Sequence, residues 1–191
     1  MMRKALLAGA LVAVTGLGGL SGCATMPETA AGPLQAPKVE LQRVEIAHYW
    51  SFYLDMKERR GSSLDLAFIF GVENPNNTTV TLEELRFTIA FEPGYELNTV
   101  NVYEKMSIPP RTTNQLRVHA AFDAYTAALS LLVTGGFRLQ EAGVKAPDQL
   151  KAWWEKIADF EFQIAVTNGT AAFSSDRGDS LAHFQATFPK K

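Results

Sequence analysis

The chain has 191 residues, of which 47% are hydrophobic, and a formal net charge of −2 at pH 7. This hydrophobic fraction is too high for an intrinsically disordered protein and suffices for a folded core. Nucleic acid is excluded as an expected partner because no basic run exceeds Arg59-Arg60 or Lys190-Lys191, and a single cysteine excludes an internal disulfide.

Residues 1–22 have the composition of a secretory signal peptide. Arg3 and Lys4 precede an apolar run of about 15 residues that ends in small side chains. A membrane-spanning helix needs roughly 20 apolar residues. The glycines at positions 9, 16, 18 and 19 also disfavour a buried helix, by about 1 kcal/mol each. We therefore predict a cleaved signal.

The end of this run holds the only cysteine. Leu20, Ser21, Gly22 and Cys23 resemble the bacterial lipobox, in which cleavage falls just before the cysteine. In that class the thiol carries a diacylglyceryl group and the new amino terminus is acylated. The resemblance implies that Cys23 is the lipidation site and that the membrane is a partner through acylated Cys23. A free thiol and an intermolecular disulfide are the alternatives, and both leave the apolar run unexplained.

In the lipoprotein class that the lipobox resembles, the residue after the cysteine carries sorting information. It is Ala24, whereas enterobacterial lipoproteins retained at the inner membrane commonly have Asp there. In a Gram-negative host the resemblance therefore implies an outer-membrane location that faces the periplasm. Residues 23–37 are small, polar and rich in proline, which predicts a flexible tether. The folded domain is expected over residues 38–191.

Alternating apolar residues predict short strands through most of this domain. The pattern is clear over residues 64–70, 85–91 and 160–166. A one-residue slip within residues 39–46 predicts a strand with a bulge. Asn168-Gly169 is typical of a hairpin turn.

The apolar period becomes helical between Asp123 and Asp159. Tyr125, Leu129, Leu132 and Val133 have helical spacing, and Gly135-Gly136 is the expected C-cap of that helix. A second amphipathic helix is predicted where Leu150, Trp153, Trp154 and Ile157 recur at helical spacing. We predict a mainly β protein, a fibronectin III/immunoglobulin-like antiparallel β-sandwich with a helical insertion at about residues 124–157.

Two stretches, LAFIFGVENPNNTTVTLEELRFTIAFEPG and SIPPRTTNQLRVHAAFD, carry a family resemblance. They resemble the type-2 late-embryogenesis-abundant (LEA) proteins and their WHy domain, named for water stress and hypersensitive response. The resemblance implies a seven-stranded β-sandwich and a role in desiccation or osmotic stress. Its motif is Asn74-Pro75-Asn76. Pro75 fixes φ near −65° and Asn side chains bond nearby backbone, so we predict a structural turn, with an exposed recognition loop as the alternative.

The sequence predicts no catalytic residues, metal or cofactor. His48, His119 and His183 lie on separate stretches, and no nucleophile elbow or phosphate loop is present.

Three tryptophans, Trp50, Trp153 and Trp154, are candidate apolar-binding residues. Adjacent residues on a helix point about 100° apart. We therefore expect one residue of the Trp153-Trp154 pair in the core and the other near the surface. The alternative is that both cap the open end of the sandwich.

The leading functional hypothesis is a lipid-anchored, non-enzymatic envelope protein that contributes to desiccation or osmotic stress tolerance. A periplasmic binder or carrier of an apolar ligand is one alternative. An adaptor that binds other envelope proteins is the second.

Overall fold

Apolar residues alternate along most of residues 34–190, the part of the chain that the computed structural model describes, and these stretches are strands. The strands are β1 Lys38–Tyr49, β2 Leu54–Asp55, β3 Arg60–Gly61, β4 Ser63–Glu73, β5 Val80–Phe91, β6 Glu96–Val102, β7 Met106–Ile108, β8 Thr113–Asp123, β9 Ile164–Ser175 and β10 Gly178–Phe188. The helices are α1 Ala124–Glu141, α2 Ala146–Lys156 and the 3₁₀ turn η1 Ile157–Asp159.

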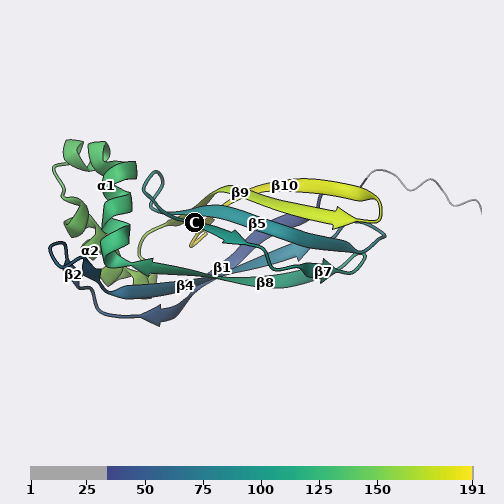
Figure 1. Ribbon diagram of the computed structural model, residues 1–191, viewed down its shortest axis with the longest axis horizontal. Coiled ribbons are helices and arrows are strands. Elements are labelled where there is room, and N and C mark those ends of the chain that lie inside the picture. The colour runs from purple at the N-terminus through teal and green to yellow at the C-terminus, as the bar shows by residue number, and fades with distance from the viewer. Residues whose placement is uncertain (1–33, 191) are drawn as a thin grey trace, which may run out of the picture. The chain divides into compact units, whose positions relative to one another are not determined.

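The strands form two packed antiparallel sheets (Figure 1). One has the order β1-β4-β8, and the other has the order β10-β9-β5-β6, with β7 also paired to β5. A small hairpin pairs β2 with β3. The order of the seven long strands is that of a fibronectin-like sandwich, so the predicted fold class is confirmed.

The core lies between the inner faces of the two sheets. Phe70 of β4 packs against Phe87 of β5 with ring centroids 5.1 Å apart, and both side chains are fully buried. Each buried side chain of this size contributes about 1.5–3 kcal/mol to folding. The alternation of β4 and β5 that the sequence shows therefore fixes which faces of the sheets meet.

Two irregularities interrupt the pairing. The predicted bulge in β1 is confirmed, because the register with β4 shifts between Leu41 and Arg43. The hairpin turn predicted at Asn168-Gly169 is wrong. These residues lie inside β9, where Asn168 has φ 52° and the register with β10 shifts between Phe184 and Ala186. Asn tolerates positive φ, so the pair forms a bulge instead of a turn.

The helical insertion begins where β8 ends. Oδ1 of Asp123 accepts hydrogen bonds from the backbone N–H groups of Tyr125 and Thr126, both at 3.0 Å, and so caps α1. The predicted end of α1 at Gly135-Gly136 is wrong, because the helix continues to Glu141. Gly135 is instead a packing position: a Cβ there would lie 2.5 Å from Cδ1 of Tyr95.

The elements divide between two ends of the sandwich. The helices and the β2–β3 hairpin lie at one end, where β1 finishes and β4 begins (Figure 1). At the opposite end Lys38, the first residue of β1, pairs with Glu73 next to the Asn74-Pro75-Asn76 motif. We call these the helical end and the motif end.

Candidate functional site

The motif end holds the segment that leads into the domain. The backbone N–H of Gln35 donates to Oδ1 of Asn76 at 2.9 Å, and Nδ2 of Asn76 donates to the carbonyl of Gln35 at 2.8 Å. Pro37 is buried, and Leu34 packs against the core. Residues 34–37, predicted as tether, are therefore held to the domain. That part of the prediction is wrong because the side chain of Asn76, 41 residues away, binds Gln35.

Asn74 is the centre of this junction and is fully buried. Its Nδ2 lies within hydrogen-bond distance of three carbonyl oxygens, those of Thr78 (2.8 Å), Ile108 (3.1 Å) and Pro109 (3.1 Å). Its Oδ1 accepts from the backbone N–H and the Nδ2 of Asn76 at 2.9 and 3.0 Å. The motif thus ties together its own turn, the β7–β8 connection and the incoming chain.

Pro75 stands between the two asparagines and is half-buried.

The predicted signal peptide and the lipobox lie outside the residues that the structure describes. The lipobox consists of Leu20, Ser21, Gly22 and Cys23.

The three candidate tryptophans separate into two kinds. Trp153 and Trp154 are 1% and 0% exposed, so the expectation that one of them lies near the surface is wrong. They are core residues under the helical end: Trp153 packs edge-on against Phe91. Trp50 is 63% exposed, and its carbonyl accepts a 2.8 Å hydrogen bond from Nε1 of Trp154. Only Trp50 is available to a ligand.

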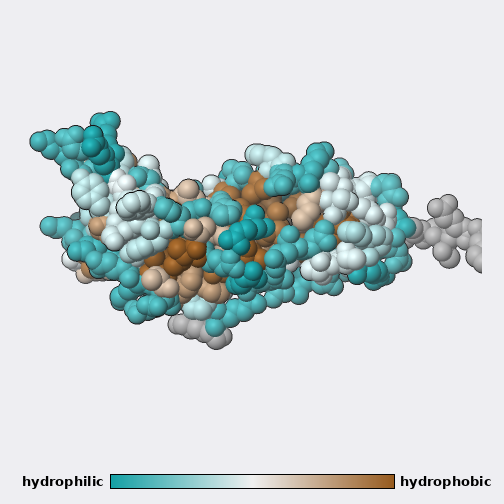
Figure 2. Space-filling model, turned by 90° about the horizontal axis from the view of Figure 1, so that it is seen from below, coloured by the Kyte–Doolittle hydropathy of each residue, from teal (hydrophilic) through white to brown (hydrophobic). Residues whose placement is uncertain are grey.

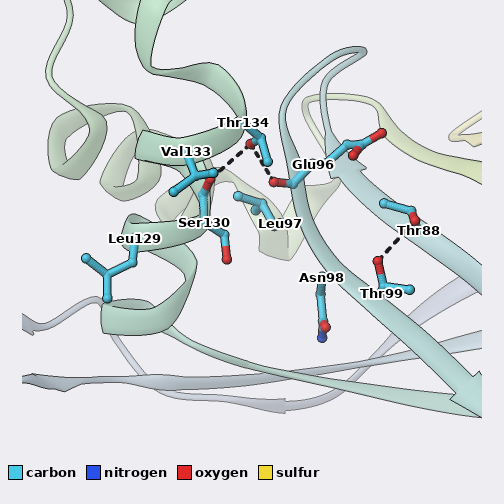
Figure 3. Close-up of a pocket in the computed structure, with 9 residues that line it drawn as sticks. All are labelled: Thr88, Glu96, Leu97, Asn98, Thr99, Leu129, Ser130, Val133 and Thr134. Carbon is cyan, nitrogen blue, oxygen red and sulfur yellow. Dashed lines mark hydrogen bonds between the residues drawn. The ribbon is translucent and has the colours of Figure 1, made fainter.

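A groove of about 500 Å³ runs between α1 and the edge strand β6 (Figure 3). From α1, Leu129, Ser130, Val133 and Thr134 line it; β6 contributes Glu96–Thr99 and β5 contributes Thr88. The hydroxyl of Thr134 donates to the carbonyl of Glu96 at 2.8 Å, which fastens the helix to the strand edge. The groove contains a single ionisable side chain, that of Glu96, and holds no pair of groups for acid–base chemistry.

The outward side of α1 is apolar. Val133 and Phe137 are each 86% exposed, and Leu129 and Leu132 are partly exposed beside them. We call these four residues the α1 outer face. Apolar residues also reach the surface elsewhere, as toward the middle of the face drawn in Figure 2. Val133 and Phe137 are nevertheless the most exposed large hydrophobic side chains of residues 34–190.

Charged side chains gather on the outer face of the three-stranded sheet. Glu45 pairs with Arg43 and Arg117, each at 2.6 Å, and these hydrogen bonds hold the pKa of Glu45 below 4.5. Nδ1 of His119 lies 2.8 Å from Oδ2 of Asp65. The stems of such side chains cover Ile69 of β4, which pairs with Arg43 and Arg117 and is 1% exposed on this outer side. The cluster shields the sheet from water.

Within the described residues, no three His, Cys, Asp or Glu side chains are grouped so that they could hold a metal ion. His48, His119 and His183 lie on β1, β8 and β10 respectively. No helix among residues 34–190 is both long and apolar enough to cross a bilayer.

Two features of the site were not predicted from the sequence. The first is Gln35, whose contact with Asn76 depends on pairing across 41 residues. The second is the α1 outer face. The spacing of Leu129, Leu132 and Val133 was the available signal, but it indicates an apolar stripe without saying whether the stripe is buried.

Comparisons with known proteins add no family assignment. No protein-family model and no curated protein matches the chain. A protein from Archaeoglobus fulgidus is 13% identical, with 80% of this chain and 98% of that one covered and a TM-score of 0.42. An Arabidopsis thaliana protein is 11% identical, with 83% of each chain covered and a TM-score of 0.48.

A third solved structure, described as a late embryogenesis abundant (LEA) protein, is 12% identical over 81% of this chain and 72% of that one, with a TM-score of 0.43. Likenesses at this level say nothing about function. The β-sandwich assignment stands on the strand pairing itself.

Proposed function

We propose that this chain is a lipid-anchored, non-enzymatic protein of the cell envelope. The observation that carries the proposal is the position of the single cysteine, Cys23, directly after an apolar signal-like run and the residues Leu20-Ser21-Gly22. Cleavage before Cys23 and acylation of its thiol and amino group would hold the mature chain on a membrane. Ala24 favours the outer membrane, with the domain in the periplasm.

The way the chain enters the domain supports an anchored module. The side chain of Asn76 forms two hydrogen bonds with the backbone of Gln35. Force applied through the lipidated segment is therefore transmitted to the hydrogen-bond network of the buried residues Asn74 and Asn76. Such a network resists local opening better than a frayed terminus would. The polar clusters around Asn74 and around Glu45 bond to strands and turns of the same domain. This supports a protein that acts by binding other surfaces and not by catalysis.

The physiological context that we propose is tolerance of desiccation or osmotic stress. It rests on the resemblance of the stretch around Asn74-Pro75-Asn76 to the type-2 LEA class. A folded sandwich with a buried core would act there as a surface module at the membrane, not as a hydrating coil.

The test is survival after drying and rewetting. A deletion strain is complemented either with the wild-type gene or with a Cys23→Ala form. This form is secreted through a signal peptide that lacks a lipobox. We expect a survival defect that only the wild type restores. Full survival of the deletion strain would remove the stress role, and equal rescue by both forms would remove the need for the anchor.

The two alternatives now differ in strength. Burial of Trp153 and Trp154 removes two of the three residues on which the apolar-ligand alternative rested. The adaptor alternative gains from the exposed α1 outer face, because large exposed apolar patches mark interaction sites. Cross-linking in intact cells that captures only non-specific neighbours would argue against an adaptor.

A further inference from the structure

Helix α1 has two apolar sides, and the sequence of the helix explains how they differ. One side, made mostly of small residues, is buried: Ala124, Ala127, Ala128, Leu131, Gly135 and Leu139. The other is the α1 outer face, whose members recur at positions 129, 132, 133 and 137 and so share one side of a helix. An ordinary surface helix has polar residues on that side. We therefore expect the exposed apolar side of α1 to contact a further apolar surface outside the domain.

The α1 outer face is rigidly presented. Gly135 lets the Tyr95 ring approach the helix closely, and Thr134 bonds the carbonyl of Glu96. At the far end of the helix, Nη1 of Arg138 donates to the carbonyl of Gly94 at 2.8 Å. Since the C-terminal half of α1 is fastened to the loop and strand at residues 94–96 and its first turn is capped by Asp123, the helix cannot roll to bury its outer face.

The chemistry of the α1 outer face suits lipid. No charged residue occurs from Ala124 to Phe137, and the first, Arg138, is tied to Gly94. Leu, Val and Phe side chains can enter the headgroup and acyl boundary of a bilayer without carrying a charge into it. The polar side of a free amphipathic helix is unnecessary here, because the domain itself covers the other side of α1.

The chain between the anchor and the domain decides which surface is within reach. Eleven Cα-to-Cα steps separate Cys23 from Leu34, and they can span roughly 40 Å at full extension. The 12-residue strand β1 leads from the motif end to the helical end, a length of about 40 Å. The tether therefore allows the domain to lie on its side with the helical end against the bilayer that holds the lipid.

We propose that the α1 outer face is a second membrane contact, which rests in the interface of the bilayer that carries the lipid anchor. This inference builds on the proposed function, since the anchor keeps the bilayer at a high effective concentration beside α1. A protein partner would have to arrive by diffusion. Lipid is the occupant always present.

The experiment attaches the mature chain artificially, so it does not depend on acylation in cells. The unacylated chain from Cys23 onward contains the whole described domain, and its one thiol is coupled to a maleimide lipid in phosphatidylethanolamine–phosphatidylglycerol vesicles. Phe137→Trp places a fluorophore on the α1 outer face. The matched control, Tyr103→Trp, is also strongly exposed (70%) and lies in the β6–β7 connection. Brominated lipid quenches tryptophan that enters the bilayer.

We expect brominated lipid to quench the added emission of Phe137→Trp and not that of Tyr103→Trp, each measured against the wild type with its native tryptophans. Adding Val133→Asp to Phe137→Trp should abolish the quenching. Equal or stronger quenching of Tyr103→Trp would show that the β6–β7 connection enters the bilayer at least as deeply as the α1 outer face, and would overturn the proposal. The proposal would also be overturned if the lipid-free protein sedimented as a dimer and Phe137→Asp converted it to a monomer, because a second copy would then cover α1.

A failure here is distinguishable from a failure of the proposed function. If Phe137→Trp is not quenched on vesicles while Cys23 is acylated in cells, only the second contact is wrong. If Cys23 is unmodified in cells, the anchor is wrong whatever the vesicles show.

Discussion

The side-chain amide of Asn76 exchanges two hydrogen bonds with the main chain of Gln35, at 2.9 and 2.8 Å. A carboxamide can present an N–H donor and a C=O acceptor side by side, as a strand residue does toward its hydrogen-bonded partner in an antiparallel pair. Asn76 therefore treats Gln35 as a neighbouring strand would, and it fixes where the N-terminal segment joins the domain.

Replacing Asn76 by Ala should release Gln35. Three side-chain hydrogen bonds are lost at a buried position, two with Gln35 and one with Oδ1 of Asn74, so we expect a destabilisation of about 1–2 kcal/mol and faster amide hydrogen exchange at Gln35. Asn77→Ala is the control, because Asn77 is exposed and bonds only Nε of Arg111. Unchanged protection of the Gln35 amide in Asn76→Ala would contradict the proposed junction.

Replacing Asn74 by Ala should cost more. The carbonyls of Ile108 and Pro109 would lose a donor inside a buried site, and we expect roughly 2–3 kcal/mol less stability in urea unfolding. Thr79→Ala, at an exposed neighbouring position, should stay within about 0.5 kcal/mol of the wild type. Equal midpoints for the two variants would show that the network around Asn74 contributes little.

Adjacent glycines of α1 should respond in opposite directions to Ala. Gly136→Ala meets no atom within 4 Å and should stabilise the domain by about 0.5–1 kcal/mol through helix propensity. Gly135→Ala places a Cβ 2.5 Å from the Tyr95 ring and should destabilise it, by about 1–3 kcal/mol. Thermal unfolding of the pair measures both. A stabilised Gly135→Ala protein would mean that α1 does not pack on Tyr95 as described.

The pH dependence of stability should include Glu45. Hydrogen bonds from Arg43 and Arg117 lower its pKa below 4.5 in the folded protein. The folded state therefore favours the charged carboxylate, and the stabilisation is complete above pH 4.5 and is lost as the pH falls through the lowered folded pKa. Glu45→Gln should flatten the loss of stability in that acid range. Identical acid limbs for the variant and the wild type would exclude a contribution from Glu45.

Local patterns predicted most of the sandwich because alternate residues of its long strands face the core, although Ala67 and Ile69 on the outer side of β4 are buried as well. The alternation at residues 64–70 and 85–91 reports that geometry directly, and these stretches lie in β4 and β5. Asn168-Gly169 misled the prediction, since the same backbone preference that forms a turn also forms a bulge inside a longer strand. Phe160 and Phe162, which alternate with the strand residues, precede β9 and fill the core from a connection.

The helical end could be predicted in outline only. Its helices follow from the change of period, but which side of α1 is buried depends on the partner surface. Tyr95 and β6 accept the small side that includes Ala127 and Gly135 and leave Val133 and Phe137 outside. Likewise, Trp153 and Trp154 both fit inside because α2 is enclosed by the core and by the backbone of Trp50.

The central claim is that Cys23 anchors the protein, and intact-mass analysis of the protein purified from membranes of its own cells tests it most directly. We predict a chain that begins at Cys23 and carries the added mass of a diacylglyceryl group and an amide-linked acyl chain. In the secreted Cys23→Ala form, whose signal peptide lacks a lipobox, that mass and the membrane association should both disappear. A mature chain that begins elsewhere, or one with an unmodified Cys23 thiol, would contradict the account.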